Sequence, residues 1–397
     1  MGYEPQLKKT FRVKSFAKLK ELLGLTTADF LEALRLPIDQ QYRRKVIPKK
    51  SGADRIVYDP HPALRKIQTK FKTRVLKKRN IISWPHYLFG SIPNPAPYEK
   101  DMLAKDYVTC AAQHANAGSV LTLDLENFFD NITLYQVEEL LKGFFRIEPF
   151  SARILARTFC RGDRLVQGAI TSSYIASLIL YRYEGDVVRR LERKNIRYTR
   201  YVDDITVSTK VADHNFFWEQ KIITDMVISA DLSLNAAKTE TQTISTAPIM
   251  VHGLRVGFEQ PRLSAEELSR IRSAVKGLEL LAEIPNYRTT KNYRHEYNRT
   301  LGRVNKLKRV GQPKHKNLVL RLNRIKPLPH PGEMRRLSKR IAWLENYYKR
   351  NKELNYYRRS FYKTYQDLNI LKRSFGRTAA ILRARLRAIR PPNAELD

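Results

Sequence analysis

The stretch that decides the fold is YTRYVDDITVSTK, residues 198–210, in which Asp203 and Asp204 lie between two runs of strand-forming residues. The aromatic and β-branched residues on both sides predict a strand, a turn and a second strand. Two adjacent anions repel each other. The tip of this predicted hairpin therefore needs compensation by a lysine, by water or by a metal ion.

A third carboxylate lies at the end of another predicted strand. Asp124 follows an apolar run (Val120, Leu121, Leu123) and precedes Asp203 by 79 residues. If the two strands are neighbours, three carboxylates converge at one end of a sheet. Hard oxygen ligands of this kind select Mg²⁺ or Mn²⁺. Two such ions about 4 Å apart would activate an attacking oxygen and stabilise a leaving pyrophosphate.

Composition narrows the class of protein. The chain has 397 residues, which is enough for two or three domains, and 42% of them are hydrophobic. No apolar run approaches the roughly 20 residues that span a bilayer, so we expect no membrane segment. The two cysteines, Cys110 and Cys160, argue against a disulfide framework or a zinc site and suit a reducing cytoplasm.

The charge is strongly positive and uneven. The chain has 74 Lys and Arg residues against 39 Asp and Glu, and residues 261–397 alone hold 34 basic and 11 acidic residues. A sustained basic field of this kind favours nucleic acid as the partner. An anionic membrane, or a helical surface that is merely solvated, is the alternative.

The first 120 residues predict helices and one hairpin. Residues 10–36 predict two short amphipathic helices joined at Gly24, with Thr27 as the N-cap of the second. Residues 41–61 predict a hairpin whose turn is PKKSGAD. Residues 62–78 have apolar residues at helical spacing and a basic opposite face.

The middle of the chain alternates between strands and helices. Residues 119–133 predict a strand that leads into a helix, and Thr133 is the expected cap of the next helix. Residues 150–159 continue as a helix, and residues 162–194 predict a loop followed by one long helix. Residues 213–230 predict a helix with Phe216, Phe217 and Trp218 in the core. Residues 232–244 and 247–258 are expected to close the sheet.

The last third predicts helices almost throughout. Ser264 and Glu267 form a capping-box pattern, and the helical periodicity that follows continues to about residue 390. The clearest linker is KPLPHPG, residues 326–332. Beyond it, Arg and Lys alternate with tyrosines that outnumber what one apolar stripe can bury, a composition suited to phosphate contact and base stacking. The residues we expect to bind RNA are Tyr347, Tyr348, Tyr356, Tyr357, Arg358 and Arg359.

The ordered set of motifs resembles a bacterial reverse transcriptase of the retron and group II intron type, over about residues 11–258. The segments that carry this resemblance are YRRKVIPKKSGADRIVYDPHPALRKIQ (42–68), LTLDLENFFDNI (121–132), RLVQGAITSSYIASLIL (164–180), YTRYVDDITVS (198–208), LSLNAAKTET (232–241) and VHGLRVG (251–257). The last of these is similar to the hairpin that grips the primer. The resemblance implies an α+β, right-hand polymerase with fingers, palm and thumb.

The resemblance also implies roles for single residues. Asp124, Asp203 and Asp204 would hold two Mg²⁺ ions, with Mn²⁺ as an alternative, and the carbonyl of Leu125 would complete one site. Phe129 matches the aromatic gate that excludes a ribose 2′-hydroxyl. The remaining roles are nucleotide-pocket lining by Gln167, triphosphate contact by Arg55 with Lys49 or Lys50, and protonation of pyrophosphate by Lys238. The alternative is a core position for Phe129 and plain surface positions for Lys49, Lys50 and Lys238.

Three positions depart from the family pattern. Ile170 stands where the family usually has proline. Retron enzymes share an Asn-Ala-x-x-His element, and here Cys110 replaces the asparagine while Ala111 and His114 are kept. They also share Val-Thr-Gly, and here His252 replaces the threonine. These departures favour a related, defence-associated reverse transcriptase over a retron enzyme.

We therefore predict four parts and one activity. The parts are N-terminal helices and fingers (1–118), palm with part of the fingers (119–260), thumb (261–326) and a basic helical C-terminal extension (333–397). The activity is RNA-directed DNA synthesis from dNTPs on a cognate structured non-coding RNA, which gives an RNA–DNA hybrid, in defence against phage. The alternatives are a retron enzyme that makes a branched RNA–DNA hybrid, protein-primed untemplated synthesis, and an inactive RNA-binding scaffold.

Overall fold

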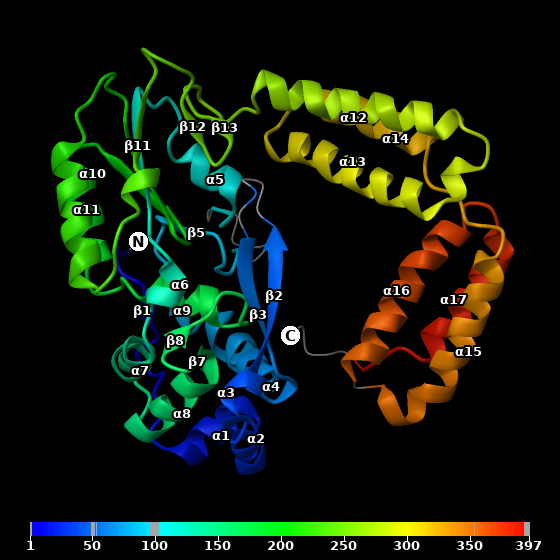
Figure 1. Cartoon of the computed structure of the whole chain (residues 1–397), viewed down its shortest axis with the longest axis horizontal. Helices are drawn as coiled ribbons and strands as arrows, with labels where there is room; N and C mark the ends of the chain where they lie inside the picture. Colours follow the sequence, from blue (N-terminus) through cyan, green and yellow to red (C-terminus); the bar gives the residue numbers. More distant parts are fainter. Residues whose placement is uncertain (1, 49–51, 53, 96–102, 353, 393–397) are drawn as a thin grey trace. The chain divides into compact units, whose positions relative to one another are not determined.

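The computed structural model describes residues 2–48, 52, 54–95, 103–352 and 354–392 (Figure 1). This described part of the chain divides into two compact units, one within residues 1–262 and the other within residues 263–396. The first unit combines helices with a sheet, and the second is helical. The α+β class predicted from the sequence is therefore confirmed.

The N-terminal helices are those expected, with one change of cap. The helices are α1 (Phe16–Leu23), α2 (Thr27–Leu34) and the short α3 (Ile38–Gln41). Gly24 ends α1 at φ 58°, a left-handed conformation that glycine adopts without strain. The predicted cap Thr27 was wrong. Thr26 caps α2 instead, because its hydroxyl accepts from Asp29 N while the Asp29 carboxylate accepts from Thr26 N.

The predicted hairpin and the helix after it are confirmed. The hairpin pairs β2 (Tyr42–Pro48) with β3 (Asp54–Pro60) in antiparallel register. Helix α4 (Pro62–Phe71) buries Leu64 and Ile67 and continues into one π-helical turn over Lys72–Leu76. Nearby, β1 (Gln6–Leu7) pairs with β4 (Ile82–Ser83).

The centre of the first unit is a sheet that, within the described residues, has five strands in the order β11-β6-β10-β9-β5. Its pairs are antiparallel, except that β5 runs parallel to β9. The strands are β5 (Leu88–Phe89), β6 (Ser119–Asp124), β9 (Arg197–Tyr201), β10 (Asp204–Thr209) and β11 (Glu240–Thr243). The predicted strand-turn-strand at residues 196–208 is therefore confirmed.

The two faces of this sheet differ in polarity. On one face, Leu121, Leu123, Tyr198, Ile205 and Val207 join the main hydrophobic core. That core also receives side chains from α7 (Leu134–Gly143), α8 (Pro149–Phe159), α9 (Ser172–Leu178), α10 (Glu184–Arg193) and α11 (Phe217–Ser229). Helices α10 and α11 contact each other and stand side by side in Figure 1.

The other face carries polar side chains and is partly covered by α5 (Tyr107–Ala112). Because strand residues alternate between faces, Thr199, Thr206 and Ser208 share this face with Asp124 and Asp204. The alternation thus separates a hydrophobic side, which holds the fold, from a polar side, which is free for chemistry.

Three expectations for the middle of the chain were wrong. The long helix predicted to follow residues 162–171 is broken into α9 and α10, with turns at residues 179–183, where Ile179, Tyr181 and Tyr183 have weaker helix propensity. Phe217 is 75% exposed, although Phe216 is buried as expected. The segment 247–258 forms its own hairpin, β12 (Met250–Val251) with β13 (Leu254–Arg255), and does not extend the sheet.

Short elements complete the first unit. Helix α6 (Phe128–Asn131) follows β6, as predicted, and Thr133 caps α7 through a capping box with Gln136. A small hairpin pairs β7 (Cys160–Arg161) with β8 (Arg164–Leu165), and a 3₁₀ turn covers Ala236–Lys238.

The second unit contains the predicted helices. They are α12 (Ala265–Glu283), α13 (Lys291–Arg309), α14 (Lys314–Arg324), α15 (Glu333–Asn351), α16 (Asn355–Leu371) and α17 (Gly376–Ala388), with a 3₁₀ turn at Tyr287–Thr289. Ser264 caps α12 by accepting from Glu267 N, but the Glu267 carboxylate pairs with Lys306 and does not return the contact. The capping box was therefore half right.

The proline-rich segment 326–332 is non-helical, as predicted, but it is tied to the helices before it. Leu328 N donates to the Arg288 carbonyl at 2.9 Å. Arg294 of α13 then pairs with Glu333 of α15 at 3.1 Å and with Asp367 of α16 at 3.3 Å. These partly buried ion pairs join the first three helices of the unit to the last three.

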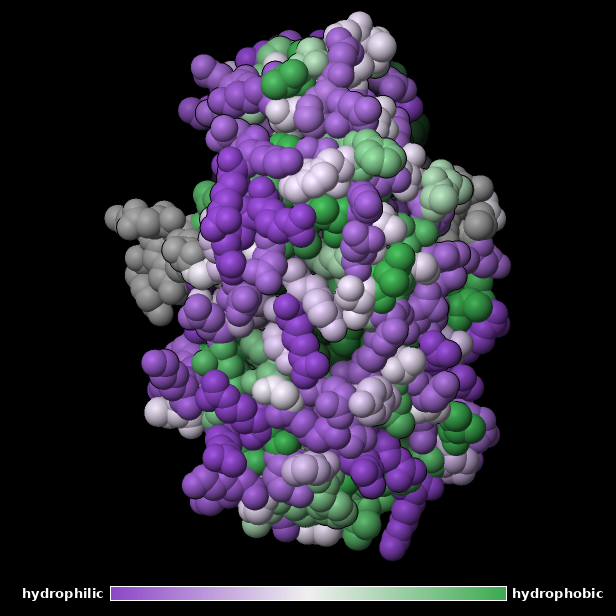
Figure 2. Space-filling model, turned by 90° about the vertical axis from the view of Figure 1, so that its left-hand side faces the viewer, coloured by the Kyte–Doolittle hydropathy of each residue, from purple (hydrophilic) through white to green (hydrophobic). Residues whose placement is uncertain are grey.

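The face drawn in Figure 2 is mostly hydrophilic, with hydrophobic residues scattered in small groups. Such a surface agrees with a charge-rich chain whose apolar side chains are packed inside. Among the described residues, none of the helices has the length and apolar character that crossing a membrane requires.

Candidate active site

The three predicted carboxylates meet at one end of the sheet. Asp204 lies directly opposite Asp124 in the register of β10 and β6, and Asp203 is in the turn that precedes β10. Leu125 N donates to the Asp203 carbonyl at 3.1 Å, which continues the strand contact into this turn. Val202 has φ 62°, a left-handed conformation that is costly for a β-branched residue. The surrounding structure must hold this turn in place.

The electrostatics of the cluster favour a bound cation. Burial, together with the charge of Asp124, raises the pKa of Asp203 above its ordinary value. Burial, and then the charges of Asp203 and Asp124, raise the pKa of Asp204 to about 6. Lys238 Nζ donates to Asp124 Oδ2 at 2.8 Å, and Arg55 offsets part of the charge at Asp203. Nearby cations therefore leave part of the negative charge uncompensated.

This donor set fits hard divalent cations. Among the described residues, no group of three His, Cys, Asp or Glu side chains is already arranged at metal-binding distances. The chemistry of the donors nevertheless matches Mg²⁺ or Mn²⁺, because carboxylate and backbone carbonyl oxygens are the ligands these ions prefer. Burial, and then mutual repulsion, disfavour the negative charges of Asp203 and Asp204 and raise their pKa values, and these are the charges that such ions would neutralise.

Lys238 is delivered to the cluster by the backbone. Asn235 N donates to the Asp124 carbonyl at 2.8 Å, and the 3₁₀ turn that follows carries Lys238. The side chain of Lys238 is 62% exposed. Its hydrogen bond to Asp124 raises the pKa of Lys238, so the ammonium stays protonated.

The Gln-Gly segment packs against β3. The Gln167 carbonyl accepts from Tyr58 N at 2.8 Å. Gly168 has φ 106°, and a Cβ there would lie 2.7 Å from the Tyr58 carbonyl oxygen, so only glycine fits. Ile170 N donates to the buried Gln68 side chain at 3.1 Å, a bond that proline could not make. The departure at Ile170 thus has a local partner.

The other predicted nucleotide contacts differ in their surroundings. Phe129 is half-buried beside Phe128, with ring centroids 5.8 Å apart. Arg55 is exposed on β3 and acts electrostatically on Asp203. Lys49 and Lys50 lie outside the described residues.

A buried ion pair that sequence analysis did not single out supports the turn at Val202 and Asp203. Arg200 is fully buried and forms a two-pronged contact with Glu184, with Nε to Oε1 at 2.5 Å and Nη2 to Oε2 at 2.7 Å. Its Nη1 donates to the Val202 carbonyl at 3.0 Å, and its Nη2 also donates to the Ser177 carbonyl. The sequence could have indicated this position, because Arg200 is two residues after Tyr198 and therefore lies on the same, core-facing side of the strand.

The two retron-pattern departures touch each other. Cys110 Sγ lies 3.3 Å from His252 Nε2, although the residues are 142 positions apart. His114, which keeps the family pattern, is fully buried between Ser208 Oγ at 2.7 Å and Thr199 Oγ1 at 2.8 Å. Burial lowers the pKa of His114 to about 3, so the ring is neutral.

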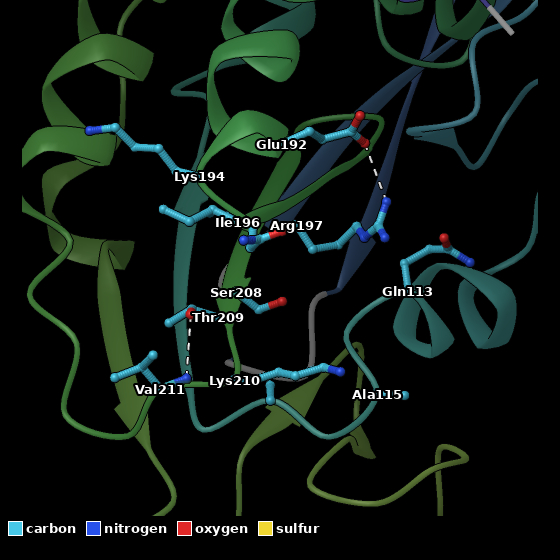
Figure 3. Close-up of a pocket in the computed structure, with 12 residues that line it drawn as sticks. Gln113, Ala115, Glu192, Lys194, Ile196, Arg197, Ser208, Thr209, Lys210 and Val211 are labelled. Atoms are coloured by element: carbon cyan, nitrogen blue, oxygen red, sulfur yellow. Dashed lines mark hydrogen bonds and ion pairs between the residues drawn. The ribbon is translucent and has the colours of Figure 1, made fainter.

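A cavity of about 770 Å³ lies at the far end of β9 and β10 from the aspartates (Figure 3). Arg197 and Lys210 contribute cations to its wall, whereas the Lys194 ammonium lies 3.5 Å from the centroid of the Trp218 ring, and Arg197 pairs with Glu192 at 3.2 Å. Ser208, which contacts His114, is also part of this wall. The cavity is thus separate from the acidic cluster, although it shares two strands with it.

The residues predicted to bind RNA differ in exposure. Tyr347 and Tyr356 are 42% and 45% exposed, Arg359 is exposed, and Tyr348 and Arg358 are half-buried. Tyr357 is fully buried and donates its hydroxyl to the Ile389 carbonyl, so it is a core residue and cannot stack on a base. Sequence analysis missed Trp343, whose ring stacks on Tyr347 with centroids 4.6 Å apart.

Comparison with known proteins agrees with this geometry. Residues 47–276 match the family described as reverse transcriptase (RNA-dependent DNA polymerase). The chain therefore belongs to the reverse transcriptases and is an RNA-directed DNA polymerase with the predicted right-hand fold. It is of the bacterial retron type, because it is 39% identical over 358 residues to the retron Ec48 reverse transcriptase of Escherichia coli, covering 90% of this chain and 87% of that one.

Two further relatives and one solved structure extend the comparison. The chain is 28% identical to the retron Se72 reverse transcriptase of Salmonella heidelberg, over 80% of each chain. It is 26% identical to the retron Ec86 reverse transcriptase of Escherichia coli, over 62% of this chain and 73% of that one. A Candida albicans telomerase structure matches with a TM-score of 0.39 at 12% identity, over 93% of this chain and 70% of that one. The changes at Cys110 and His252 therefore do not separate the chain from retron enzymes.

The buried pair generates a test of the catalytic turn. Arg200→Met leaves the Glu184 carboxylate buried without its partner, so we expect a loss of about 3–5 kcal/mol in the free energy of unfolding. Adding Glu184→Met should recover most of that stability in urea titrations. Nucleotide incorporation should stay low in the double variant, because the Val202 carbonyl has still lost its donor. Full activity in the stable double variant would show that Arg200 is not needed to position the turn.

Proposed function

We propose that the chain copies a cognate structured non-coding RNA into DNA, with Asp124, Asp203, Asp204 and the carbonyl of Leu125 as ligands of two Mg²⁺ ions. The observation that carries the proposal is the register that sets Asp204 opposite Asp124, with Asp203 in the adjoining turn. When bound, the two ions supply the positive charge that activates the attacking 3′-hydroxyl and stabilises the leaving pyrophosphate.

The chain's own residues would position the nucleotide and move one proton. Arg55 would contact the triphosphate, because it is exposed and already interacts with Asp203. Gln167 and Phe129 would line the nucleotide pocket, each half-buried near a fixed backbone. Lys238 would donate a proton to the departing pyrophosphate, since it is protonated and 2.8 Å from Asp124.

The similarity to retron enzymes changes the order of the two product hypotheses. A retron enzyme makes a branched RNA–DNA hybrid, and the 39% identity to the Ec48 enzyme makes this the first hypothesis for the product. A role in defence against phage accompanies it as part of the proposal. Protein-primed synthesis is supported by no contact among the described residues.

The first test removes two of the metal-binding charges. Asp203→Asn with Asp204→Asn should lower Mg²⁺-dependent dNTP incorporation by more than about a thousandfold, because several kcal/mol of transition-state stabilisation are lost. The affinity for RNA that co-purifies with the protein should stay within about twofold of the wild-type value, since the palm carboxylates do not contact phosphates. Extension at the wild-type rate by the double variant would refute the assignment.

The second test concerns the choice of sugar. Phe129→Ala should raise incorporation of ribonucleotides relative to deoxyribonucleotides by roughly tenfold, because the ring no longer excludes the 2′-hydroxyl. The matched control is Phe128→Ala, whose ring is buried beside it in the core. The control should lower stability, by about 3–5 kcal/mol, without changing the sugar ratio. An equal ratio of ribonucleotide to deoxyribonucleotide incorporation in both variants would show that Phe129 is a core residue and not a sugar gate.

We also propose that the last helices select the RNA. The candidate contacts are Tyr347, Tyr348, Tyr356, Arg358 and Arg359, and the surface around them is supported by the ring of Trp343. Exposed rings flanked by guanidinium groups suit unpaired bases and phosphates. Deleting residues after Gly332 would leave Arg294 without Glu333 and Asp367. Point changes are therefore the better test.

Tyr356→Ala should weaken binding to the co-purifying RNA by about 1–3 kcal/mol, the usual value for one stacked base. Arg359→Ala should reduce the slope of log affinity against log salt by about 1, because one phosphate contact is lost. Tyr362→Ala is the control, since Tyr362 is 49% exposed but lies edge-on to Phe361 and not in the Trp343 group. An effect of equal size at Tyr362 would mean that stacking is not specific.

A further inference from the structure

The contact between Cys110 and His252 joins two parts of the first unit. Cys110 is on α5 with no exposed surface, and His252 is in the turn between β12 and β13. The thiol sulfur also lies 3.4 Å from Thr199 Oγ1 on β9. Cys110 thus lies between the sheet and the hairpin and touches both.

His252 makes a second contact, with the catalytic motif. Its ring packs on the ring of Tyr201, with centroids 4.9 Å apart. Tyr201 is paired with Asp204 in the register of β9 and β10. His252 and Gly253 both have positive φ, 49° and 77°, as a tight hairpin turn requires. Histidine is one of the few residues other than glycine that adopt this conformation readily, and here its ring also makes both contacts.

The groups behind Cys110 form one connected chain. From His252 it runs through Cys110, Thr199 and His114 to Ser208, with separations of 3.3, 3.4, 2.8 and 2.7 Å. All four contacts can be hydrogen bonds with one direction of donation. The His252 Nε2–H donates to Cys110, the thiol donates to Thr199, the Thr199 hydroxyl donates to His114 Nε2, and His114 Nδ1–H donates to Ser208. Satisfied buried networks of this kind are rigid, so Cys110 is held at a fixed place under the hairpin.

Other roles for the pair do not fit. A soft-metal site would need further ligands, and among the described residues no third His, Cys, Asp or Glu side chain is arranged with this pair at metal-binding distances. Burial raises the pKa of Cys110 to about 12, so the thiol is a poor nucleophile. Both cysteines are free thiols. What remains is a positioning role, in which the pair fixes the hairpin beside the catalytic motif.

We propose that Cys110 and His252 act as one unit that clamps the β12–β13 hairpin on Tyr201, and so holds this hairpin, which resembles the family's primer grip, in place beside the 3′ end of the priming strand. The proposal rests on the polymerase function proposed above, because it assigns a place to one of that reaction's substrates. Neither residue touches the reacting atoms, so both are positioning residues. Their loss should therefore weaken use of the primer and leave use of the nucleotide unchanged.

The experiment uses the full chain with oligo(dT) annealed to poly(rA) and with dTTP. Cys110→Ala and His252→Ala should each raise KM for primer–template about fivefold, the effect of losing one ordinary hydrogen bond, with KM for dTTP unchanged. KM for primer–template in the double variant should not exceed the higher of the two single-variant values, because both changes break the same contact. Cys110→Ser, which keeps a donor and an acceptor, should restore the wild-type KM.

Cys160→Ala is the matched control, because Cys160 is equally buried but lies in the β7–β8 hairpin. It should lower the melting temperature without changing KM for primer–template. Amide exchange of residues 250–255 tests the clamp without activity, and it should be faster in Cys110→Ala than in Cys160→Ala. If the alanine variants do not fold, Cys110→Ser and His252→Gln are measured in the same two assays. His252→Gln, which loses the ring on Tyr201, should then show the higher primer KM and the faster exchange, and equal values in the two variants would overturn the clamp.

The outcomes separate the clamp from the polymerase assignment. An additive double variant, or an unchanged primer KM in both single variants, would overturn the clamp. So would equal exchange of residues 250–255 in the Cys110→Ala and Cys160→Ala proteins. Absence of dTTP incorporation by the wild-type chain would refute the proposed function instead, while faster exchange of residues 250–255 in Cys110→Ala would still support the structural half of the clamp.

Discussion

The structure depends on a register that places like charges face to face. Asp204 is directly opposite Asp124, with Asp203 in the adjoining turn, and none of these positions can be moved without shifting every side chain of β10 to the other face. Carboxylates facing one another across two strands are destabilising. The fold accepts this cost at one end of the sheet because the hydrophobic face of the same strands is fully packed. Lys238 and Arg55 then reduce the repulsion without abolishing it.

The catalytic turn is held from both faces of the sheet, by different chemistry. On the hydrophobic side, the buried Arg200–Glu184 pair reaches the Val202 carbonyl and so fixes a strained backbone. On the polar side, His252 packs on Tyr201 and is itself held by Cys110. An ion pair can be buried on the hydrophobic side because the Glu184 carboxylate also accepts a hydrogen bond from Tyr198, so its charge is compensated. Neutral groups suit the polar side, because a further charge there would act on Asp204.

Local patterns were enough to predict most of the elements. The alternation of apolar and polar residues predicted β6, β9 and β10, and apolar residues at helical spacing predicted α4 and α12, because each pattern is contained within one element. The errors fell where a neighbour in space decides the outcome. Phe217 is hydrophobic but exposed, and the long helix breaks before Glu184, whose buried carboxylate is bonded to Arg200. Tyr357 has the same flanking charges as Tyr356, yet it faces the core of its own bundle.

The site was predictable to the extent that a motif carries its own geometry. An aspartate in a hairpin turn, the next at the start of the following strand and a third at the end of a neighbouring strand converge if the strands pair in this register, and they do. The contacts that support them join residues far apart in the chain, such as Lys238 with Asp124 and His252 with Cys110, so no single motif contains them. Taken one at a time, Cys110 and His252 each depart from the retron pattern. In the fold the two residues touch, so the thiol at one changed position contacts the imidazole at the other. The chain belongs to its family with both changes in place.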